Sequence, residues 1–241
     1  MRLLIVGCEY AGKTTLARVI SQWMIAVMGL RMVRWHNHFV VPRLDGHLLV
    51  RAEGDITAIG KEAADLNTAE DEEQIMALRP SVLEQLQRHN IWRHLHPDLF
   101  RDDDTLFVNH YYADAVYAPI YYSYGESGSF SDRRARARAW DAELLERAPE
   151  TVLVLVRAAA ETIKDRMRQT PRVGGILRKV DVPHVLDCFD REYKESLIHR
   201  KFALDTTDAS ADATFEQFLE HVRPHLSTTD QRRMTQTPGS K

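Results

Sequence analysis

Residues 7–14 read Gly7-Cys8-Glu9-Tyr10-Ala11-Gly12-Lys13-Thr14. This octapeptide matches the pattern G-x-x-x-x-G-K-[ST] at every fixed position. Glycines allow the backbone to fold so that successive N–H groups point toward phosphate oxygens. In this pattern the lysine reaches the β- and γ-phosphates, and the hydroxyl of the last residue binds Mg²⁺. The octapeptide therefore predicts a phosphate-binding loop, with Lys13 as the catalytic cation and Thr14 as the metal ligand.

The residues on either side of the octapeptide are those that such a loop needs. Residues 2–6 form a short apolar run typical of a buried strand, and residues 13–28 carry apolar side chains at helical spacing. A glycine-rich turn that carries a lysine by coincidence lacks this setting, and Cys8 is interpreted as a small filler residue. The predicted nucleotide-binding residues are Gly7, Cys8, Glu9, Tyr10, Ala11, Gly12, Lys13, Thr14 and Thr15.

Short apolar runs alternate with amphipathic stretches along most of the chain. We expect strands at residues 2–6, 31–36, 105–108, 151–156 and 201–205. We expect helices at residues 13–28, 72–95 (interrupted at Pro80), 132–147, 160–168, 183–197 and 212–225. Strands separated by helices imply right-handed crossovers and a parallel sheet. We therefore predict an α/β, three-layer P-loop NTPase fold, with about five parallel strands in the order 2-3-1-4-5 and helices on both faces.

No long linker divides the sequence, so residues 1–226 are predicted to form one domain, with a lid segment near 164–180. Residues 40–68 mix prolines, glycines and charges, which favours loops and a short helix. Residues 227–241 are polar and rich in threonine, which favours a flexible tail.

The composition of the 241-residue chain is that of a globular protein, with 44% hydrophobic and 28% charged residues. No apolar run approaches the ~18 residues of a membrane helix, and the run at residues 3–6 is too short for a signal peptide. Cys8 and Cys188 are far apart and fit a reduced setting. A net charge of −3 provides no general attraction to nucleic acid or membranes. We expect a cytoplasmic protein with a small-molecule partner and no membrane or nucleic-acid partner.

Three features narrow the class of nucleotide-binding protein. The guanine-reading motif Asn-Lys-x-Asp does not occur in the sequence, which argues against a GTPase. A sheet of about five strands argues against large motor ATPases. A basic stretch after the fourth strand could neutralise charge during phosphoryl transfer, although a solvated basic face is an equal alternative. This stretch contains Lys164, Arg166, Arg168, Arg172, Arg178 and Lys179.

The run from residue 1 to about residue 226 resembles the family of thymidylate kinases and deoxynucleoside kinases. Gly12-Lys13-Thr14-Thr15-Leu16 is similar to the family's Gly-Lys-Thr-Thr-Leu. Asn109-His110-Tyr111 stands where the family has Asp-Arg-Tyr or Glu-Arg-Ser. Residues 162–168 resemble the helix that leads into the family's arginine-bearing lid, and residues 189–206 resemble its C-terminal part.

The resemblance implies ATP and Mg²⁺ as cofactors, with lid charge supplied by some of Arg166, Arg168, Arg172 and Arg178. In the family, the acidic residue after the third strand helps to hold Mg²⁺ and the adjacent arginine grips the substrate. Here these places are taken by Asn109, which could orient a metal-bound water, and His110, which could contact a phosphate as a conditional cation. Asp114 follows shortly after and could replace the missing acid.

Deoxynucleoside kinases of the family also carry a carboxylate after the second strand as general base. The corresponding stretch here is Trp35-His36-Asn37-His38, so His36 or His38 could act as the base, although such histidines are more often structural. Tyr111 and Tyr117 belong to a tyrosine-rich stretch that could stack on an acceptor base, with ordinary packing as the alternative. By family position, Arg79 could hold an acceptor phosphate.

We predict an ATP-binding phosphotransferase that moves the γ-phosphoryl group of MgATP to a small acceptor, a nucleoside or nucleoside monophosphate. Two alternatives stay open: an ATPase or polynucleotide 5′-kinase with the same loop, and a nucleotide-binding protein that has lost transfer at Asn109 and His110. The resemblance also leaves a homodimer open, because relatives often dimerise through helices.

Overall fold

The computed structural model describes residues 1–30, 33–37, 68–96, 104–171 and 175–236. The strands are β1 (Arg2–Val6), β2 (Arg34–Asn37), β3 (Thr105–Val108), β4 (Val152–Arg157) and β5 (Lys201–Asp205). The α-helices are α1 (Lys13–Met28), α2 (Ala69–Met76), α3 (Pro80–His94), α4 (His110–Tyr117), α5 (Arg133–Arg147), α6 (Ala160–Gln169), α7 (Val182–Glu195), α8 (Ala211–Val222) and α9 (Thr228–Gln236). A π-helical turn, η3 (Ala118–Tyr122), continues α4, and short 3₁₀ turns lie at η4 (Lys179–Asp181) and η5 (Arg223–His225).

The five strands form one parallel sheet in the order β2-β3-β1-β4-β5, as the sequence predicts. In the register of this sheet, Ile5 of β1 lies opposite Val108 of β3 and Val154 of β4. The strands run in the same direction, so their carboxyl ends meet at one edge. The phosphate loop after β1 therefore lies beside the segments that follow β3, β4 and β5.

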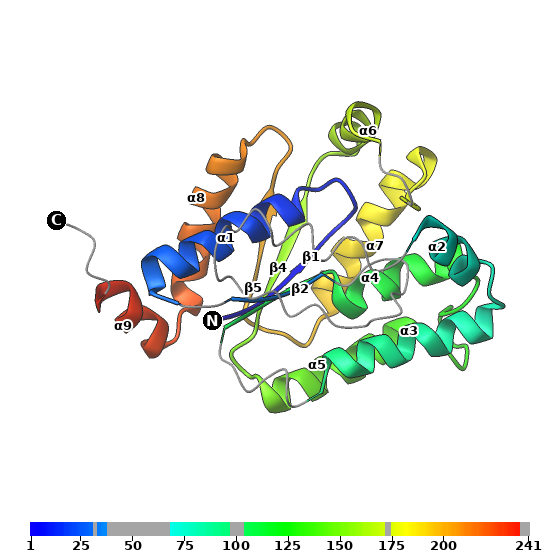
Figure 1. Ribbon diagram of the computed structural model, residues 1–241, viewed down its shortest axis with the longest axis horizontal. Coiled ribbons are helices and arrows are strands. Elements are labelled where there is room, and N and C mark those ends of the chain that lie inside the picture. The colour runs from blue at the N-terminus through cyan, green and yellow to red at the C-terminus, as the bar shows by residue number, and fades with distance from the viewer. Residues whose placement is uncertain (31–32, 38–67, 97–103, 172–174, 237–241) are drawn as a thin grey trace.

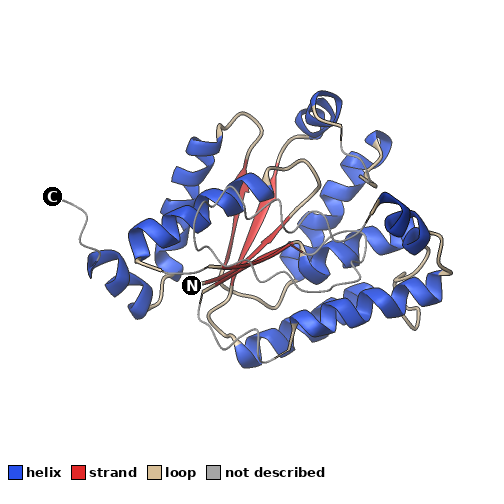
Figure 2. Cartoon of the chain, viewed as in Figure 1, coloured by secondary structure: helices blue, strands red, loops and turns tan. Residues whose placement is uncertain are grey.

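Helices cover both faces of the sheet (Figures 1 and 2). On one face α1 packs against α8 and α9, and on the other α4 packs against α5 and α7. The long helices α3 and α5 form the outermost part of the second layer (Figure 1). Among the helices that the structure describes, none combines the length and apolar character needed to cross a bilayer. The three-layer α/β architecture is confirmed.

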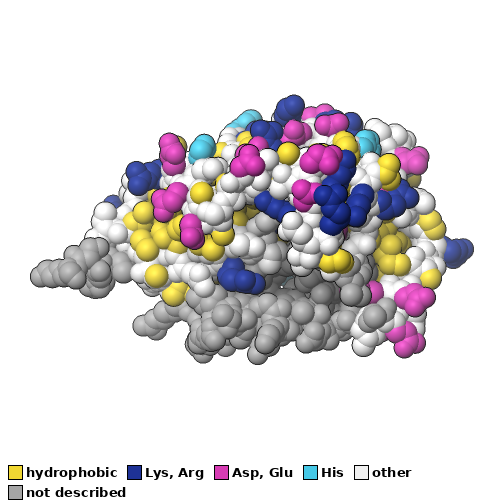
Figure 3. Space-filling model, turned by 90° about the horizontal axis from the view of Figure 1, so that it is seen from above, with side chains coloured by type: hydrophobic (Ala, Val, Ile, Leu, Met, Phe, Trp, Pro, Cys, Tyr) yellow, Lys and Arg dark blue, Asp and Glu magenta, His cyan; other side chains and the backbone are white. Residues whose placement is uncertain are grey.

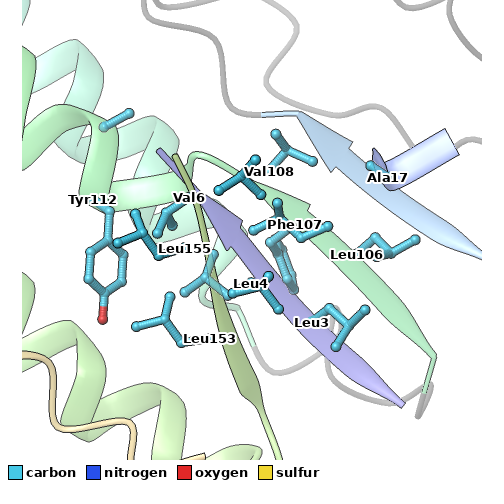
Figure 4. Close-up of a cluster of buried hydrophobic side chains, with 14 of the residues drawn as sticks. Leu3, Leu4, Val6, Ala17, Leu106, Phe107, Val108, Tyr112, Leu153 and Leu155 are labelled. Carbon is cyan, nitrogen blue, oxygen red and sulfur yellow. The ribbon is translucent and has the colours of Figure 1, made fainter. Parts of the chain in front are cut away.

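The core is centred on β1, β3 and β4, whose inward side chains are almost completely buried. Figure 4 shows Leu4, Val6, Phe107 and Leu155 from these three strands packed together. These apolar strands read as unbroken hydrophobic runs because each is covered on both faces. The core thereby provides a rigid base for the loops at the carboxyl edge.

The expected helices and strands are found, with small shifts at their ends. The second strand begins at Arg34 rather than at residue 31, and Pro80 opens α3, so the stretch 72–95 is two helices. The expected loops and short helix at residues 40–68 lie outside the described residues, except for Thr68, which is the N-cap residue of α2.

The expectation of a flexible tail after residue 226 is wrong for residues 228–236, which form α9. Asp230 of α9 is buried and bonds both the backbone N–H and the hydroxyl of Ser227, so the helix begins with a reciprocal cap. Arg233 also pairs with Asp104, immediately before β3, with 2.9 Å between Nη1 and the carboxylate. Polar composition suggested disorder here, but these polar groups are used in capping and in pairing with the domain.

Candidate active site

The phosphate loop has a backbone that only its glycines permit. Gly7 has φ = +146°, and a Cβ atom there would lie 2.1 Å from the carbonyl oxygen of Val156 in β4. Gly12 has φ = +93° and forms the N-terminal cap of α1. Because of this turn, the partial positive end of a 16-residue helix faces the loop. Glycines at both positions therefore shape the loop into a cradle, and its binding of phosphate stays a prediction.

Lys13 lies across the inner side of this loop. Its Nζ donates hydrogen bonds to the carbonyl oxygens of Gly7, at 2.7 Å, and Cys8, at 2.6 Å. The side chain is buried, so the structure holds the ammonium group at the loop instead of letting it extend into solvent. Burial raises the pKa of the Cys8 thiol to about 12, despite the neighbouring charge of Lys13. Cys8 is therefore protonated at neutral pH, in agreement with the interpretation as a filler residue.

The loop is held from the α4 side by Tyr117. The Tyr117 hydroxyl accepts a hydrogen bond of 3.0 Å from the backbone N–H of Glu9. Tyr117 is fully buried, and this burial raises the pKa of its phenol well above the usual range, so the hydroxyl stays neutral. We predicted contact between Tyr117 and an acceptor, but the structure places its hydroxyl on the phosphate loop instead. Its role here is to position the loop.

Arg166 and Thr206 hold the loop from the opposite side. Arg166 of α6 donates to the carbonyl oxygen of Tyr10, at 3.0 Å, and to that of Thr206, at 2.6 Å. The Thr206 hydroxyl, directly after β5, donates to the carbonyl oxygen of Ala11 at 3.0 Å. Together they tie the loop after β1 to the segment after β5. Arg166 therefore lies at the phosphate loop, and supply of lid charge by its guanidinium stays a prediction.

A cavity of about 340 Å³ opens beside the phosphate loop. It is bounded by the loop and α1 on one side, by the end of α6 on another, and by the segment between β5 and α8. Its lining residues are Tyr10, Gly12, Thr15, Leu16, Arg166, Gln169, Thr170, Thr206, Ala209, Ala211 and Thr214. Pockets of this size with mixed apolar and polar walls are typical small-molecule sites. Of the predicted nucleotide-binding residues, Tyr10, Gly12 and Thr15 line this cavity, together with residues from the second half of the chain.

The carboxyl end of β3 carries two consecutive residues with positive φ. Asn109 has φ = 71° and ψ = −64°, the geometry of the strained classic γ-turn, and His110 has φ = 47°. The Asn109 N–H bonds the carbonyl oxygen of Ile5 at 2.8 Å, so this turn is fixed beside the end of β1. Such backbone strain costs about 1–3 kcal/mol per residue and concentrates at functional sites. The turn marks the second candidate element of the site.

We expect replacement of Asn109 by glycine to stabilise the protein while lowering its activity. Glycine relieves roughly 1–3 kcal/mol of strain and costs about 0.5–1 kcal/mol of backbone entropy. The melting temperature should rise by about 2–4 °C for each kcal/mol gained. Asn109→Ala is the matched control, since it removes the same amide but keeps the strained φ. A melting temperature that rises equally in both variants would contradict the assignment of strain to this turn.

His110 is buried, and its ring packs 5.2 Å from the ring of Phe107 and 4.7 Å from that of Tyr111. Its contact with a phosphate stays a prediction, as does the role of Asn109 toward a metal-bound water. Thr14 is partly buried at the first turn of α1, where its binding of Mg²⁺ also stays a prediction. No group of three His, Cys, Asp or Glu side chains suited to a metal ion occurs among the residues that the structure describes.

Two predicted acceptor residues are instead part of the core. Tyr111 is fully buried, and its hydroxyl donates to Asp141 at 2.6 Å, so the predicted contact with an acceptor is wrong. Asp114 is also buried and pairs with Arg133, at 2.5 Å between Oδ2 and Nε. It therefore compensates a buried cation and does not replace the missing acid after β3. In both cases a polar atom that suggested chemistry is satisfied inside the fold.

The remaining predicted residues are placed as follows. Arg168 is exposed and pairs with Asp165 on the same helix, and Arg79 is exposed between α2 and α3. For His36 only the backbone, in β2, is described, while His38 and Arg172 lie outside the described residues. The roles of these five residues stay predictions.

Sequence reasoning missed Arg133 and the function of Thr206. An arginine in a basic run looks solvated, and only the fold shows that Arg133 is buried between α3 and α4. Thr206 directly follows the last strand. A hydroxyl residue at the carboxyl end of a parallel strand is the signal that could have indicated its contact with the phosphate loop.

The strand order, the glycine-built loop after β1 and the helices on both faces define a P-loop kinase fold. The chain is similar to deoxyadenosine kinase from M. mycoides with bound dCTP, with a TM-score of 0.57 and 13% identity over 93% of this chain and 100% of that one. It is similar to thymidylate kinase from Candida albicans, with a TM-score of 0.54 and 14% identity over 97% and 93% of the two chains. No protein-family model and no curated protein sequence matches the chain. The fold expected from the resemblance is confirmed.

Proposed function

We propose that this protein is a nucleoside or nucleotide kinase that transfers the γ-phosphoryl group of MgATP to a small acceptor. The observation that carries the proposal is the complete phosphate loop, with its lysine in place, opening onto a cavity of about 340 Å³. If the sequence match were a coincidence, the loop would not need a glycine at position 7, where a Cβ would collide with the neighbouring strand β4. The likeness in fold to deoxyadenosine and thymidylate kinases supports the same class.

The residues of the loop fit a nucleoside triphosphate. The N–H groups of residues 8–14 and the N-terminus of α1 would hold the phosphates, and Lys13 would neutralise charge on the β- and γ-phosphates. The cavity beside the loop, lined by Leu16, Gln169 and Thr214, would take the base and sugar. Arg166 and Thr206 would keep the loop rigid while the phosphates change charge.

The loop also fits Mg²⁺, which usually takes only one or two protein ligands together with substrate phosphates and waters. Thr14 would be the protein ligand, and Asn109 would orient a metal-bound water. When bound, Mg²⁺ supplies charge neutralisation on the phosphates of the donor. Gly7 lets the loop pass so close to β4 that a Cβ there would collide with the Val156 carbonyl oxygen, and this glycine-built turn is the structural reason for expecting phosphates with Mg²⁺ here.

The chain's own contribution to the reaction would be positioning and electrostatics. Phosphoryl transfer needs little covalent chemistry from the protein, so rate follows from alignment of donor and acceptor and from fixed positive charge. The strained turn at Asn109 and His110, next to the phosphate loop, would face the transferred group or the acceptor. We propose residues 1–226 as the kinase domain, with the basic segment near 164–180 as its lid.

The acceptor can be found with a coupled assay of ADP release from MgATP. Nucleosides, nucleoside monophosphates and a 5′-hydroxyl oligonucleotide are tested in parallel. We expect one of the first two classes to stimulate ADP release at least 10-fold over the acceptor-free rate. Stimulation by the oligonucleotide alone would point to a polynucleotide kinase, and unstimulated hydrolysis to an ATPase. Tight MgATP binding without turnover would favour a binding protein that has lost transfer at Asn109 and His110.

A further inference from the structure

Three side chains meet just before the first residue of α7, in a cluster that we call the Arg178 latch: Tyr121, Arg178 and Asp181. The Arg178 Nε donates to Asp181 Oδ2 at 2.6 Å, and the Tyr121 hydroxyl donates to the same oxygen at 3.0 Å. The guanidinium carbon of Arg178 lies 5.2 Å from the centre of the Tyr121 ring. The hydroxyl of Tyr121 also accepts the backbone N–H of Arg178 at 3.4 Å. Tyr121 therefore contacts both the side chain and the backbone of Arg178.

The latch joins two elements that are distant in the sequence. Tyr121 lies on the π-helical turn η3 that continues α4, whereas Arg178 immediately precedes η4 and Asp181 is the last residue of η4, before α7. The arginine remains 64% exposed, so its outer amino groups face solvent while Nε is fixed. Burial raises the pKa of Tyr121 to about 12, and hydrogen bonding to Asp181 adds to the rise, so the phenol stays protonated as a donor. The cluster holds a cation in one orientation without burying it.

Two other basic side chains of the stretch at residues 164–179 form ion pairs without support from another element. Lys164 pairs with Glu161, and Arg168 with Asp165, each within α6 and three residues apart. On the face of the molecule seen in Figure 3, basic and acidic side chains are intermixed. Exposed pairs within one helix contribute little and leave the long side chain free to move. Arg178 differs because an aromatic ring from another element supports it.

The supporting ring is in turn connected to the phosphate loop. The Tyr121 ring stacks on that of Tyr117, with 6.0 Å between the ring centres and 29° between the planes. The Tyr117 hydroxyl accepts the Glu9 N–H within the loop. Two tyrosines one helical turn apart thus link the loop that would bind the phosphates to the cation at the root of α7.

We propose that Tyr121 is a positioning residue, which holds Arg178 in the orientation that phosphoryl transfer requires. This inference rests on the proposed kinase function. Arg178 would be the group that touches the transferred phosphate, and Tyr121 would act through it. An unsupported arginine must lose its rotamer freedom in each turnover, whereas the latch removes that freedom in advance.

A double-mutant cycle with MgATP and the stimulating acceptor tests this relation. We expect Tyr121→Phe to lower kcat 3- to 10-fold, because the 3.0 Å hydrogen bond to Asp181 is worth about that factor and the 3.4 Å bond from the Arg178 N–H is long and adds little. Arg178→Ala should lower kcat at least 10-fold. The double variant should be no slower than Arg178→Ala alone, since Tyr121 acts only through Arg178. Independent, multiplying losses would overturn the proposal, because a structural role of Tyr121 would persist without the arginine.

Limited trypsin digestion supplies a readout that does not depend on kinase activity. Tyr121→Phe and Asp181→Asn should each increase the rate of cleavage after Arg178 and Lys179 at least 3-fold, because the latch holds this backbone. The control is Tyr193→Phe, which removes the hydroxyl of a half-buried tyrosine of α7 that is not part of the latch. It should leave the rate of cleavage unchanged. Equal cleavage in all variants would refute the latch even if the protein proves to be an active kinase. Faster cleavage with no kinase activity on any acceptor would refute the proposed function and the role of the latch in transfer.

Discussion

Replacing Lys13 with alanine is expected to weaken MgATP binding at least ~100-fold while the protein stays folded. The ammonium group lies 2.6–2.7 Å from two loop carbonyls, so it is already at the place where phosphate oxygens would bind. In the complex the ammonium group would donate to oxygens of the β- and γ-phosphates. Charge-assisted hydrogen bonds are about twice as strong as neutral ones, so the loss of two such bonds to MgATP costs roughly 3 kcal/mol, which is a factor of more than 100 in affinity.

Isothermal titration with MgATP measures the change, and circular dichroism with thermal melting verifies the fold. Lys194→Ala removes an exposed lysine from the end of α7 and should bind MgATP as the unchanged protein does. The core of β1, β3 and β4 does not involve Lys13, so the melting temperature should shift by only a few degrees. Unchanged MgATP affinity in a folded Lys13→Ala protein would contradict the proposed function as a whole.

The part of the site that could be predicted from the sequence is the part that is local in the chain. The loop, its preceding strand and its following helix lie within residues 2–28, so spacing alone specifies their geometry. The parallel order of the sheet followed from the alternation of strands and helices, and the structure confirms it. Such patterns are readable because each depends on neighbours in the sequence.

What could not be predicted depends on contacts between distant residues. Asp114 looked like a substitute acid because it follows Asn109 closely, but its role is set by Arg133 of another helix. Tyr117 looked like an acceptor contact, although its hydroxyl binds Glu9 more than 100 residues earlier. The α9 helix was missed because polar composition outweighed its Ser227–Asp230 cap, which is a local signal for a helix start. Burial and pairing of polar groups are properties of the fold, so a single sequence rarely reveals them.

Replacing Arg133 with methionine is expected to destabilise the protein by about 3–5 kcal/mol, because removal of one partner from a buried ion pair leaves an uncompensated charge. Arg133 is fully buried and bridges Asp114 of α4, at 2.5 Å, and Glu84 of α3, at 3.0 Å. Its guanidinium also lies 5.0 Å from the ring centre of Tyr124, whose hydroxyl bonds Asp114 at 2.8 Å. Three helices thus meet at one cation. The melting temperature should fall by roughly 10 °C or more.

Arg136→Met, an exposed change on the same helix α5, is the control and should alter the free energy of unfolding by less than about 0.5 kcal/mol. Adding Asp114→Asn and Glu84→Gln to Arg133→Met should recover part of the lost stability, since no buried charge then remains unpaired. If Arg133→Met melts like Arg136→Met, the ion-pair network contributes nothing to stability and the explanation is wrong.

The dependence of this loss on pH distinguishes charge from simple loss of packing. Burial already raises the pKa of Asp114 above its usual range, and the Arg133 charge opposes that rise. Without Arg133 the pKa of Asp114 rises further, so the native state binds a proton at pH values at which the unfolded chain does not. Stability then falls as pH increases through this interval. The difference in free energy of unfolding between the Arg133→Met variant and the unchanged protein should therefore be larger at pH 8 than at pH 5. Chemical denaturation at the two pH values measures it, and a difference independent of pH would assign the loss to packing around Tyr124 and Trp140 instead.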